Sequence, residues 1–333
     1  VSEGHILFRM QPHQLPGTVF FYDEQGVRVE RRAIKDKNDN WHGAPVIVFP
    51  TNRGDSLIVG PSLKEEDRGR PEVCQDRAAF EYAKDGTLSS FAVGDGISEG
   101  AASASIADHL VRLTADILAR TKERVGLRRL TKPLVDGIVG LIQQQLRKRL
   151  DTDVLVDDFL ATTKMVPRFS GRVVDRIRTG SVGASTLIAG MVQAGEFPEI
   201  GGRGECVTMV QVGDGGYIVI GPYDRPDQRV FGEFAPPGSA PAQVAPGRPE
   251  NVSSGSIQVN HIFLRPGEMV IAGTDGIEKG VWRTLQVFRS RAQELFQAGY
   301  TDPTQLVRRL LWEANGGAVT WADDITMFAH KAQ

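Results

Sequence analysis

The 333-residue sequence has little cysteine and no long apolar run. Its two cysteines, Cys74 and Cys206, lie in different segments, which argues against a disulfide framework and favours a reducing, cytoplasmic setting. No stretch approaches the roughly 20 uninterrupted apolar residues of a membrane span. The N-terminus lacks the basic start and apolar core of a secretory signal. We therefore expect a cytoplasmic, soluble protein without a membrane partner.

Neither sign of charge dominates. Lys and Arg number 39 and Asp and Glu number 41, so nothing global points to nucleic acid as a partner, and we expect a monomer. The largest local excess is a basic stretch made of Arg120, Lys122, Arg124, Arg128, Arg129 and Lys132. We interpret it as a solvated helix end and loop; the alternative is a docking surface for acidic or phosphorylated partners.

Several common catalytic motifs are absent. The sequence has no P-loop, no GxGxxG after a strand and no GxSxG elbow. It also lacks HExxH and a CxxC pair, and its six histidines form no ligand pair, so zinc chemistry is not indicated. No nucleophilic Cys or Ser constellation is recognisable.

Apolar runs and helical periodicity predict an α+β protein. Strands are expected at 19–22, 46–49, 56–60, 89–93, 184–192, 206–212, 217–220, 257–264, 268–273 and 325–330. Helices are expected around 106–117, at 133–150, around 285–295 and from the cap Asp302 with Pro303. This order favours antiparallel sheets with helices outside them. The Pro-, Gly- and Ala-rich residues 233–256 indicate a surface loop or flap.

Aspartates recur where these apolar strands end. FAVGDG, MVQVGDGG and MVIAGTDG place Asp95, Asp214 and Asp275 beside glycine, and the pair Asp323–Asp324 opens the last strand. A single Asp-Gly is usually only a turn. Four such sites on successive strands favour a metal site, because buried carboxylates need neutralising and Mg²⁺ and Mn²⁺ prefer oxygen ligands.

These motifs resemble those of a known family. QDR…FAVGDGISEGAASASIA, GSVGASTLI, VTMVQVGDGGYIVI, MVIAGTDGIEKG and ADDITMF are similar, in this order, to the type 2C, metal-dependent (PPM) protein phosphatases. The resemblance covers roughly residues 57–331 and suggests a divergent, bacterial-looking member. It implies a four-layer α-β-β-α sandwich of two antiparallel sheets with a metal site at one end. We therefore expect an extension of short strands and loops at 1–55 and a phosphatase domain at 56–333.

The resemblance implies two Mg²⁺ or Mn²⁺ ions. Asp95 would bridge both, with the Gly96 carbonyl completing one, while Asp275 and Asp323 would hold the other. Asp95, Asp275 and Asp323 are thus the expected catalytic residues.

Further residues would support this site. Asp76 would act mainly through metal-bound water, and Asp214 would support the site or join a third, weaker metal position. The residues expected to orient the ligands are Gln75, Thr274 and Asp324. The nearest candidate for holding substrate phosphate is Arg70, with Arg68 or Arg77 as substitutes.

The activity implied is hydrolysis of phosphoserine and phosphothreonine in a phosphorylated partner protein, by direct attack of a metal-bridging hydroxide. Three positions depart from the family pattern: Gln75 replaces a frequent acid, Ile97 a frequent His, and Gly215–Gly216 the usual Ser-Arg. Two alternatives therefore stay open. One is an inactive relative that serves as a regulatory or binding module, and the other is a two-metal hydrolase of a small phosphate ester.

Overall fold

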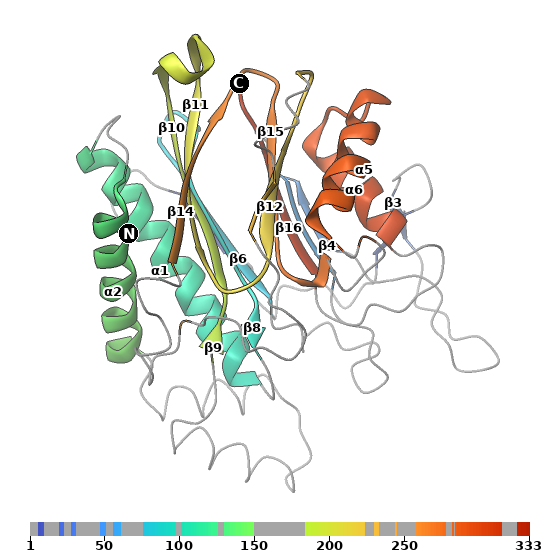
Figure 1. Ribbon diagram of the computed structural model, residues 1–333. Coiled ribbons are helices and arrows are strands. Elements are labelled where there is room, and N and C mark those ends of the chain that lie inside the picture. Colours follow the sequence, from blue (N-terminus) through green and yellow to red (C-terminus); the bar gives the residue numbers. More distant parts are fainter. Residues whose placement is uncertain are drawn as a thin grey trace, which may run out of the picture. The chain divides into compact units, whose positions relative to one another are not determined.

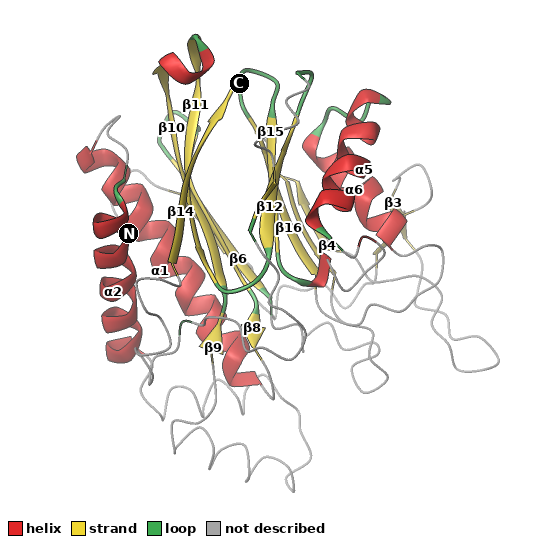
Figure 2. Cartoon of the chain, viewed as in Figure 1, coloured by secondary structure: helices red, strands yellow, loops and turns green. Residues whose placement is uncertain are grey.

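The computed structural model of the protein is shown in Figures 1 and 2. It describes residues 6–9, 20–22, 28–30, 47–50, 56–60, 76–97, 101–125, 130–149, 184–223, 230–232, 244, 257–277, 282, 284–314 and 325–333. Contacts between residues divide the chain into two compact units. Unit 1 comprises Val1–Met10, Gln75–Asp214 and Ala235–Phe263; unit 2 comprises Gln11–Cys74, Gly215–Phe234 and Leu264–Gln333. Two antiparallel sheets with helices make the chain an α+β protein, as the sequence predicts.

Unit 1 contains a six-stranded sheet in the order β1-β6-β7-β10-β11-β14. Its strands are β1 (Ile6–Arg9), β6 (Arg77–Tyr82), β7 (Leu88–Gly94), β10 (Leu187–Phe197), β11 (Gly202–Val212) and β14 (Ile257–Leu264). The two strands expected at 184–192 and 206–212 are confirmed as β10 and β11, and they pair as a hairpin with a register from Leu187↔Val212 to Phe197↔Gly202. A short turn of 3₁₀ helix, Pro198–Ile200, connects these two strands.

Two helices, α1 (Ala101–Val125) and α2 (Lys132–Arg149), belong to this unit and are seen beside its sheet in Figure 1. α1 packs on β6, β7 and β10. Its residues Ile106, Leu110 and Leu113 are buried in one core with apolar residues of α2 and of the sheet, which confirms the helical spacing read from the sequence.

Unit 2 contains a second six-stranded sheet in the order β13-β12-β15-β16-β5-β4. Its strands are β4 (Ile47–Pro50), β5 (Ser56–Gly60), β12 (Gly216–Ile220), β13 (Val230–Phe231), β15 (Met269–Gly273) and β16 (Ile325–Lys331). The core of this unit joins residues of β12, β15 and β16 to those of α5 (Leu285–Gln297) and α6 (Pro303–Ala314).

Helices α5 and α6 each begin at a side-chain cap. Thr284 accepts a hydrogen bond from the Val287 N–H at 3.2 Å, and Asp302 Oδ1 accepts one from the Gln305 N–H at 3.0 Å. The second cap is the one predicted from Asp302 and Pro303. The sequence signal was therefore sufficient to locate the start of α6.

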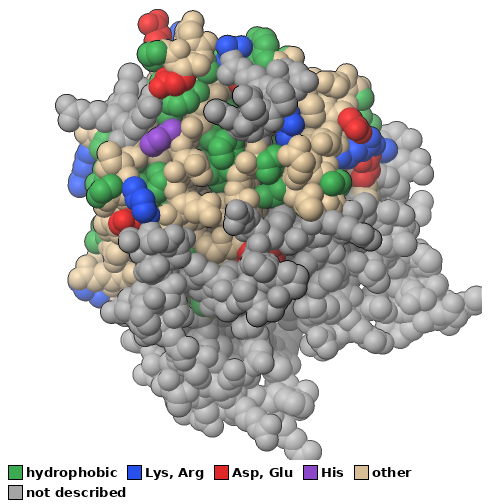
Figure 3. All heavy atoms as spheres, in the orientation of Figure 1, with side chains coloured by type: hydrophobic (Ala, Val, Ile, Leu, Met, Phe, Trp, Pro, Cys, Tyr) green, Lys and Arg blue, Asp and Glu red, His purple; other side chains and the backbone are tan. Residues whose placement is uncertain are grey.

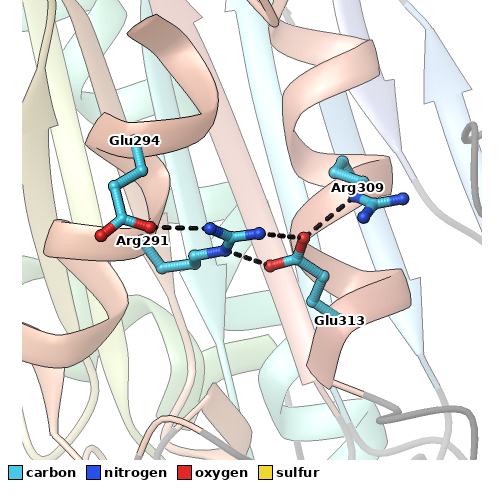
Figure 4. A network of polar contacts seen from close by, with 4 residues as sticks. All are labelled: Arg291, Glu294, Arg309 and Glu313. Atoms are coloured by element: carbon cyan, nitrogen blue, oxygen red, sulfur yellow. Dashed lines mark hydrogen bonds and ion pairs between the residues drawn. The ribbon is translucent and has the colours of Figure 1, made fainter. Parts of the chain in front are cut away.

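An ion-pair network joins α5 and α6 (Figure 4). Arg291 donates through Nη2 to Glu313 Oε1 at 2.7 Å and through Nη1 to Glu294 Oε2 at 2.7 Å. Its Nε also donates to Glu313, and Arg309 Nε reaches the same carboxylate at 3.0 Å. The hydrogen bonds that Arg291 donates to the Glu313 carboxylate are the main reason why the pKa of Arg291 is raised. The network therefore ties the two helices together at their outer faces.

The first 55 residues contribute strands to both sheets. β1 pairs with β6 of unit 1, and β4 pairs with β5 of unit 2. Two further short strands, β2 (Phe20–Tyr22) and β3 (Arg28–Glu30), pair with each other. The assignment of residues 1–55 as an extension stays a prediction. Of the expected flap at 233–256 only Val244 is described.

Two observations on the described residues concern membranes and surface charge. None of the helices that the structure describes combines the length and apolar character needed to span a membrane. On the face shown in Figure 3, basic and acidic side chains of the described residues lie interspersed rather than in one broad patch.

Candidate metal centre

Two predicted ligands lie side by side at one end of the unit 1 sheet. Asp76 directly precedes β6, and Asp95 directly follows β7. The register of these strands pairs Arg77 with Gly94, so Asp76 and Asp95 are the next residues on adjacent strands. Asp76 is fully buried and Asp95 is half-buried. The sheet thus brings together two carboxylates that are 19 residues apart in the sequence.

The backbone of Asp95 is held by Thr186. The Thr186 N–H donates to the Asp95 carbonyl at 2.9 Å, and the Asp95 N–H donates to Thr186 Oγ1 at 3.4 Å. Thr186 directly precedes β10, the strand that pairs with β7. Its part in the site was not predicted, although it belongs to the GSVGASTLI motif.

Glycine is needed immediately before Asp95. A Cβ at Gly94 would lie 2.9 Å from Ser185 Oγ, 3.1 Å from Val111 Cγ1 and 3.2 Å from the Thr186 carbonyl oxygen. The end of β7 therefore approaches both α1 and the start of β10 too closely for a side chain. This close packing fixes the position from which the Asp95 carboxylate projects.

Beyond Asp95 the chain forms a short strand, β8 (Gly96–Ile97), which pairs with β9 (Ala184–Ser185). Ser185 in turn exchanges two backbone hydrogen bonds with Val244, at 3.1 and 2.8 Å. The backbone at Gly96, whose carbonyl is a predicted ligand, is thus fixed by pairing with Ser185. Its role as a ligand stays a prediction.

Asp214 lies at the same end of the unit 1 sheet. It follows β11, and the register Leu187↔Val212 places the residues after Val212 next to Thr186. Asp214 is half-buried and stands between two glycines in the left-handed region, Gly213 with φ 92° and Gly215 with φ 98°. The ends of β6, β7 and β11 therefore each carry a carboxylate.

The Gly215–Gly216 departure from the family pattern has a structural reason. Gly215 needs its positive φ, which a serine adopts only with strain. A Cβ at Gly216 would lie 2.3 Å from Leu285 Cδ1 and 2.8 Å from the Phe231 carbonyl oxygen. Both glycines are thus explained by local packing.

Unit 2 carries Asp275 directly after the Gly273–Thr274 end of β15, and this carboxylate is 7% exposed. The Thr274 N–H donates to the Thr326 carbonyl at 3.1 Å, and Thr274 Oγ1 accepts from the Thr326 N–H at 3.0 Å. A Cβ at Gly273 would lie 2.9 Å from that same Thr326 carbonyl oxygen. Thr274 therefore fixes the end of β15 against the start of β16.

The other predicted site residues lie outside the described part of the chain: Arg68, Arg70, Gln75, Asp323 and Asp324. Arg77, the other substitute for Arg70, is 1% exposed and donates from Nη1 to the Asp76 carbonyl at 2.7 Å. That position makes it a support for the start of β6.

The donors present fit a hard divalent cation. In unit 1, Asp76, Asp95 and Asp214 offer only carboxylate oxygens, which Mg²⁺ and Mn²⁺ prefer, and they are buried or half-buried. In unit 2, the buried Asp275 offers the same kind of donor. Glycines and threonines hold the backbone at Asp95 and beside Asp275. Among the residues that the structure describes, no three His, Cys, Asp or Glu side chains lie close enough together to form a metal-binding group.

Comparison with known proteins bears on the fold. No family model and no curated protein matches the sequence. The catalytic domain of the serine/threonine protein phosphatase PstP, in complex with two manganese ions, is 14% identical over 86% of this chain and 99% of its own, with a TM-score of 0.50. A second structure, the Mycobacterium tuberculosis phosphatase PstP/Ppp, is 14% identical over 84% and 97%, also with a TM-score of 0.50.

The PPM Ser-Thr phosphatase MsPP from Mycobacterium smegmatis, in complex with cacodylate, is 16% identical over 86% of this chain and 97% of its own, with a TM-score of 0.42. At such identities a structural likeness establishes the fold alone. The fold assignment rests on the two PstP structures. The chain has the fold of the metal-dependent PPM phosphatases, the family that its sequence resembles.

Proposed function

We propose that this protein is a metal-dependent phosphatase that hydrolyses phosphoserine and phosphothreonine in a partner protein. The observation that carries the proposal is the set of carboxylates at one end of the unit 1 sheet. Asp76, Asp95 and Asp214 stand at the ends of β6, β7 and β11, in a donor set that contains only oxygen. A cation bound at this end of the sheet would offset the repulsion between these carboxylates.

In this proposal two Mg²⁺ or Mn²⁺ ions are held by Asp95, the Gly96 carbonyl, Asp275 and Asp323, with Asp76 and Asp214 in support. The structure of the PstP catalytic domain is a complex with two manganese ions, which supports this metal choice. When bound, such ions would lower the pKa of a coordinated water and offset charge on phosphoryl oxygens.

The chain's own part is to hold the carboxylates in place. The paired bonds between Thr186 and Asp95, and those between Thr274 and Thr326, fix the backbone at the ends of β7 and β15. Tight positioning matters because displacing a ligand by about 1 Å can lower a rate by roughly a hundredfold.

The test is hydrolysis of p-nitrophenyl phosphate and of a phosphothreonine peptide, with and without Mn²⁺. We expect Asp95→Asn and Asp275→Asn to lower kcat by at least about a hundredfold, because a neutral amide replaces a charged ligand. Calorimetry should show weaker Mn²⁺ binding in both variants, while circular dichroism shows an intact fold. Asp85→Asn is a matched control, since Asp85 lies in the exposed turn between β6 and β7.

Three results separate this proposal from its alternatives. Wild-type rates in Asp95→Asn and Asp275→Asn would overturn the assignment of the site. Mn²⁺ binding without hydrolysis of any substrate would identify an inactive relative. A clear preference for small phosphate esters over phosphopeptides would identify a small-molecule hydrolase. The Gly215–Gly216 departure no longer favours an inactive relative, because φ and packing account for both glycines.

A further inference from the structure

A groove runs between α1 and α2, entirely within unit 1. It has a volume of about 580 Å³ and is lined by residues from 113–125 of α1 and 133–145 of α2; we call it the α1–α2 groove. None of the residues proposed to hold metal lines it. The groove therefore has no part in the function proposed above.

Its wall exposes apolar surface. Leu134 and Leu141 line the groove and are each 43% exposed, and only four large hydrophobic side chains are exposed in the whole described part of the chain. Leu134 and Leu141 are seven residues apart on one face of α2, which separates them by two helical turns, about 10 Å along the axis. Leaving two leucines together in water is unfavourable, so a concentrated apolar site of this kind indicates a binding surface.

A glycine lies between these leucines on the groove wall. A Cβ at Gly137 would meet no atom within 4 Å, in contrast to Gly94, Gly190 and Gly216, where a Cβ would collide with neighbouring atoms. Apart from proline, glycine is the least favourable residue in a helix interior. Nothing in the packing of unit 1 requires it here, but a missing side chain lets another backbone approach α2 closely.

One end of the groove is basic. Arg120 and Arg124 line it from α1; Arg120 pairs with Asp116 at 2.8 Å, whereas the described residues offer Arg124 no ion pair. Lys132 opens α2 at this end, but its Nζ donates to the Ile257 carbonyl at 2.9 Å and pairs with Asp136 at 3.3 Å, so its charge is already used. Lys122 does not contribute, because its Nζ bonds to the Leu88 carbonyl at 3.4 Å and Ser89 Oγ at 3.5 Å.

Asp116 also lines the groove, one helical turn from Leu113, and its charge is taken up by the pair with Arg120, while Leu141 and Gln145 line the same end from α2. Leucines therefore dominate one end of the groove, and at the other end Arg124 presents a positive charge that has no ion pair among the described residues.

From this pattern we infer that the α1–α2 groove binds an amphipathic α-helix of a partner protein, with acidic residues at one end of that helix. Apolar anchors at i, i+3 or i+4 and i+7 match the two-turn spacing of Leu134 and Leu141. Gly137 lets the helix approach α2 between them, and its acidic end lies against Arg120 and Arg124. The acids supply charge complementarity, which sets the orientation of the helix in the groove.

The experiment uses the full chain and two display libraries of 16-residue helical peptides. Both carry leucine at the anchor spacing; one has Glu and Asp at one end, and the other has Lys and Arg at the same positions. We expect enrichment of the acidic library only. Fluorescence anisotropy of the enriched peptides should show at least tenfold weaker binding to Leu141→Asp and Arg124→Glu, whose side chains are exposed and whose replacement leaves the core intact.

A matched pair of glycine variants separates binding from helix stability. Gly137 and Gly140 are both exposed in α2 with open space around them, but only Gly137 lines the groove. Alanine at either position should raise the melting temperature by about 1–3 °C. Gly137→Ala should also weaken the peptide several-fold, whereas Gly140→Ala should bind as the wild type does.

Three outcomes would overturn the inference. The first is no enrichment, or equal enrichment of both libraries. The second is binding that is insensitive to Leu141→Asp and to Gly137→Ala. The third is a concentration-dependent dimer in sedimentation that Leu134→Asp abolishes, which would make a second copy of this chain the occupant. These readouts need no turnover, so they stand whether or not the protein is a phosphatase.

Discussion

In each of the two sheets, a strand that leads to a predicted metal-binding aspartate ends with a glycine, a threonine and that aspartate close together. The two sheets arrange these three residues differently. In unit 1 the threonine lies on the neighbouring strand, and Thr186 Oγ1 accepts from the Asp95 N–H. In unit 2 the threonine precedes the aspartate on its own strand, and Thr274 Oγ1 accepts from the neighbouring Thr326 N–H. Both strands end in a glycine, Gly94 or Gly273, where a Cβ would collide with the adjacent strand.

The comparison teaches what a strand end near a charged site requires. Where the ladder stops, backbone N–H groups lose their regular partners, and a buried donor without an acceptor is costly. A threonine hydroxyl replaces the missing carbonyl in each unit, and the glycine lets it come close enough. The carboxylate next in the chain is thereby held by backbone bonds rather than by its own contacts alone.

The largest difference between the units should be a pH response that belongs to unit 1. Glu81 of β6 is 1% exposed, and burial, followed by the nearby Asp116 carboxylate, raises its pKa from 4.5 to about 7. Between these values the unfolded chain releases a proton that the folded chain keeps, so the free energy of unfolding falls as pH rises. The loss should be about 3 kcal/mol from below pH 4.5 to above pH 7.

Urea denaturation of the wild type and of Glu81→Gln at a series of pH values measures this effect. The variant should show a flatter pH dependence over that window, since glutamine carries no titrating proton. An unchanged slope in Glu81→Gln would contradict the assignment. Hydrogen exchange at β6 and β7 should locate the loss in the unit 1 sheet.

Replacing Gly94 or Gly273 with alanine should show which of these two strand ends lies closer to the backbone next to it. At Gly273 the new Cβ would lie 2.9 Å from a backbone oxygen of β16, whereas at Gly94 the nearest backbone oxygen is 3.2 Å away. We expect Gly273→Ala to lower the free energy of unfolding by about 2 kcal/mol and Gly94→Ala by about 1 kcal/mol. Thermal and urea unfolding measure both, with Gly140→Ala as a control that should stabilise. The reverse ranking would show that β16 yields more easily than Thr186 does.

Replacing Thr274 or Thr186 with valine removes the hydroxyl group and keeps the size and shape of the side chain. Thr274→Val leaves the buried Thr326 N–H without its acceptor at 3.0 Å and should cost about 1.5 kcal/mol. Thr186→Val breaks a longer bond of 3.4 Å and should cost about 0.5 kcal/mol. If the proposed function is right, Mn²⁺ affinity should fall in both variants while the fold persists. Equal losses of stability in the two variants would mean that hydrogen-bond length does not predict how much each threonine contributes.

The smallest expected effect lies at the surface of unit 2, in the network of Figure 4. Arg291 is 39% exposed, so solvent screens its bonds to Glu313 and Glu294. Arg291→Met should lower the free energy of unfolding by about 0.5 kcal/mol at low salt and by less at 1 M salt. A loss that does not depend on salt would indicate packing rather than charge.

Local signals in the sequence were sufficient for most elements. The helical spacing of Ile106, Leu110 and Leu113 and the cap at Asp302 predicted α1 and the start of α6, and both are confirmed. Strand β6 was missed because its sequence, RAAFEY, mixes Arg77 and Glu81 with apolar residues, although all six are buried. A buried charged residue breaks the alternation by which a strand is recognised.

What the sequence determined by itself is the order of the elements and the chemistry at the strand ends, because periodicity and Asp-Gly pairs depend only on near neighbours. Only the tertiary structure decided that Asp76 lies beside Asp95, that Thr186 and Thr274 support the strand ends, and that Gly215 and Gly216 serve a turn and a close contact. The physical reason is register: which residues meet across a sheet depends on pairing between distant strands, and no local pattern records it.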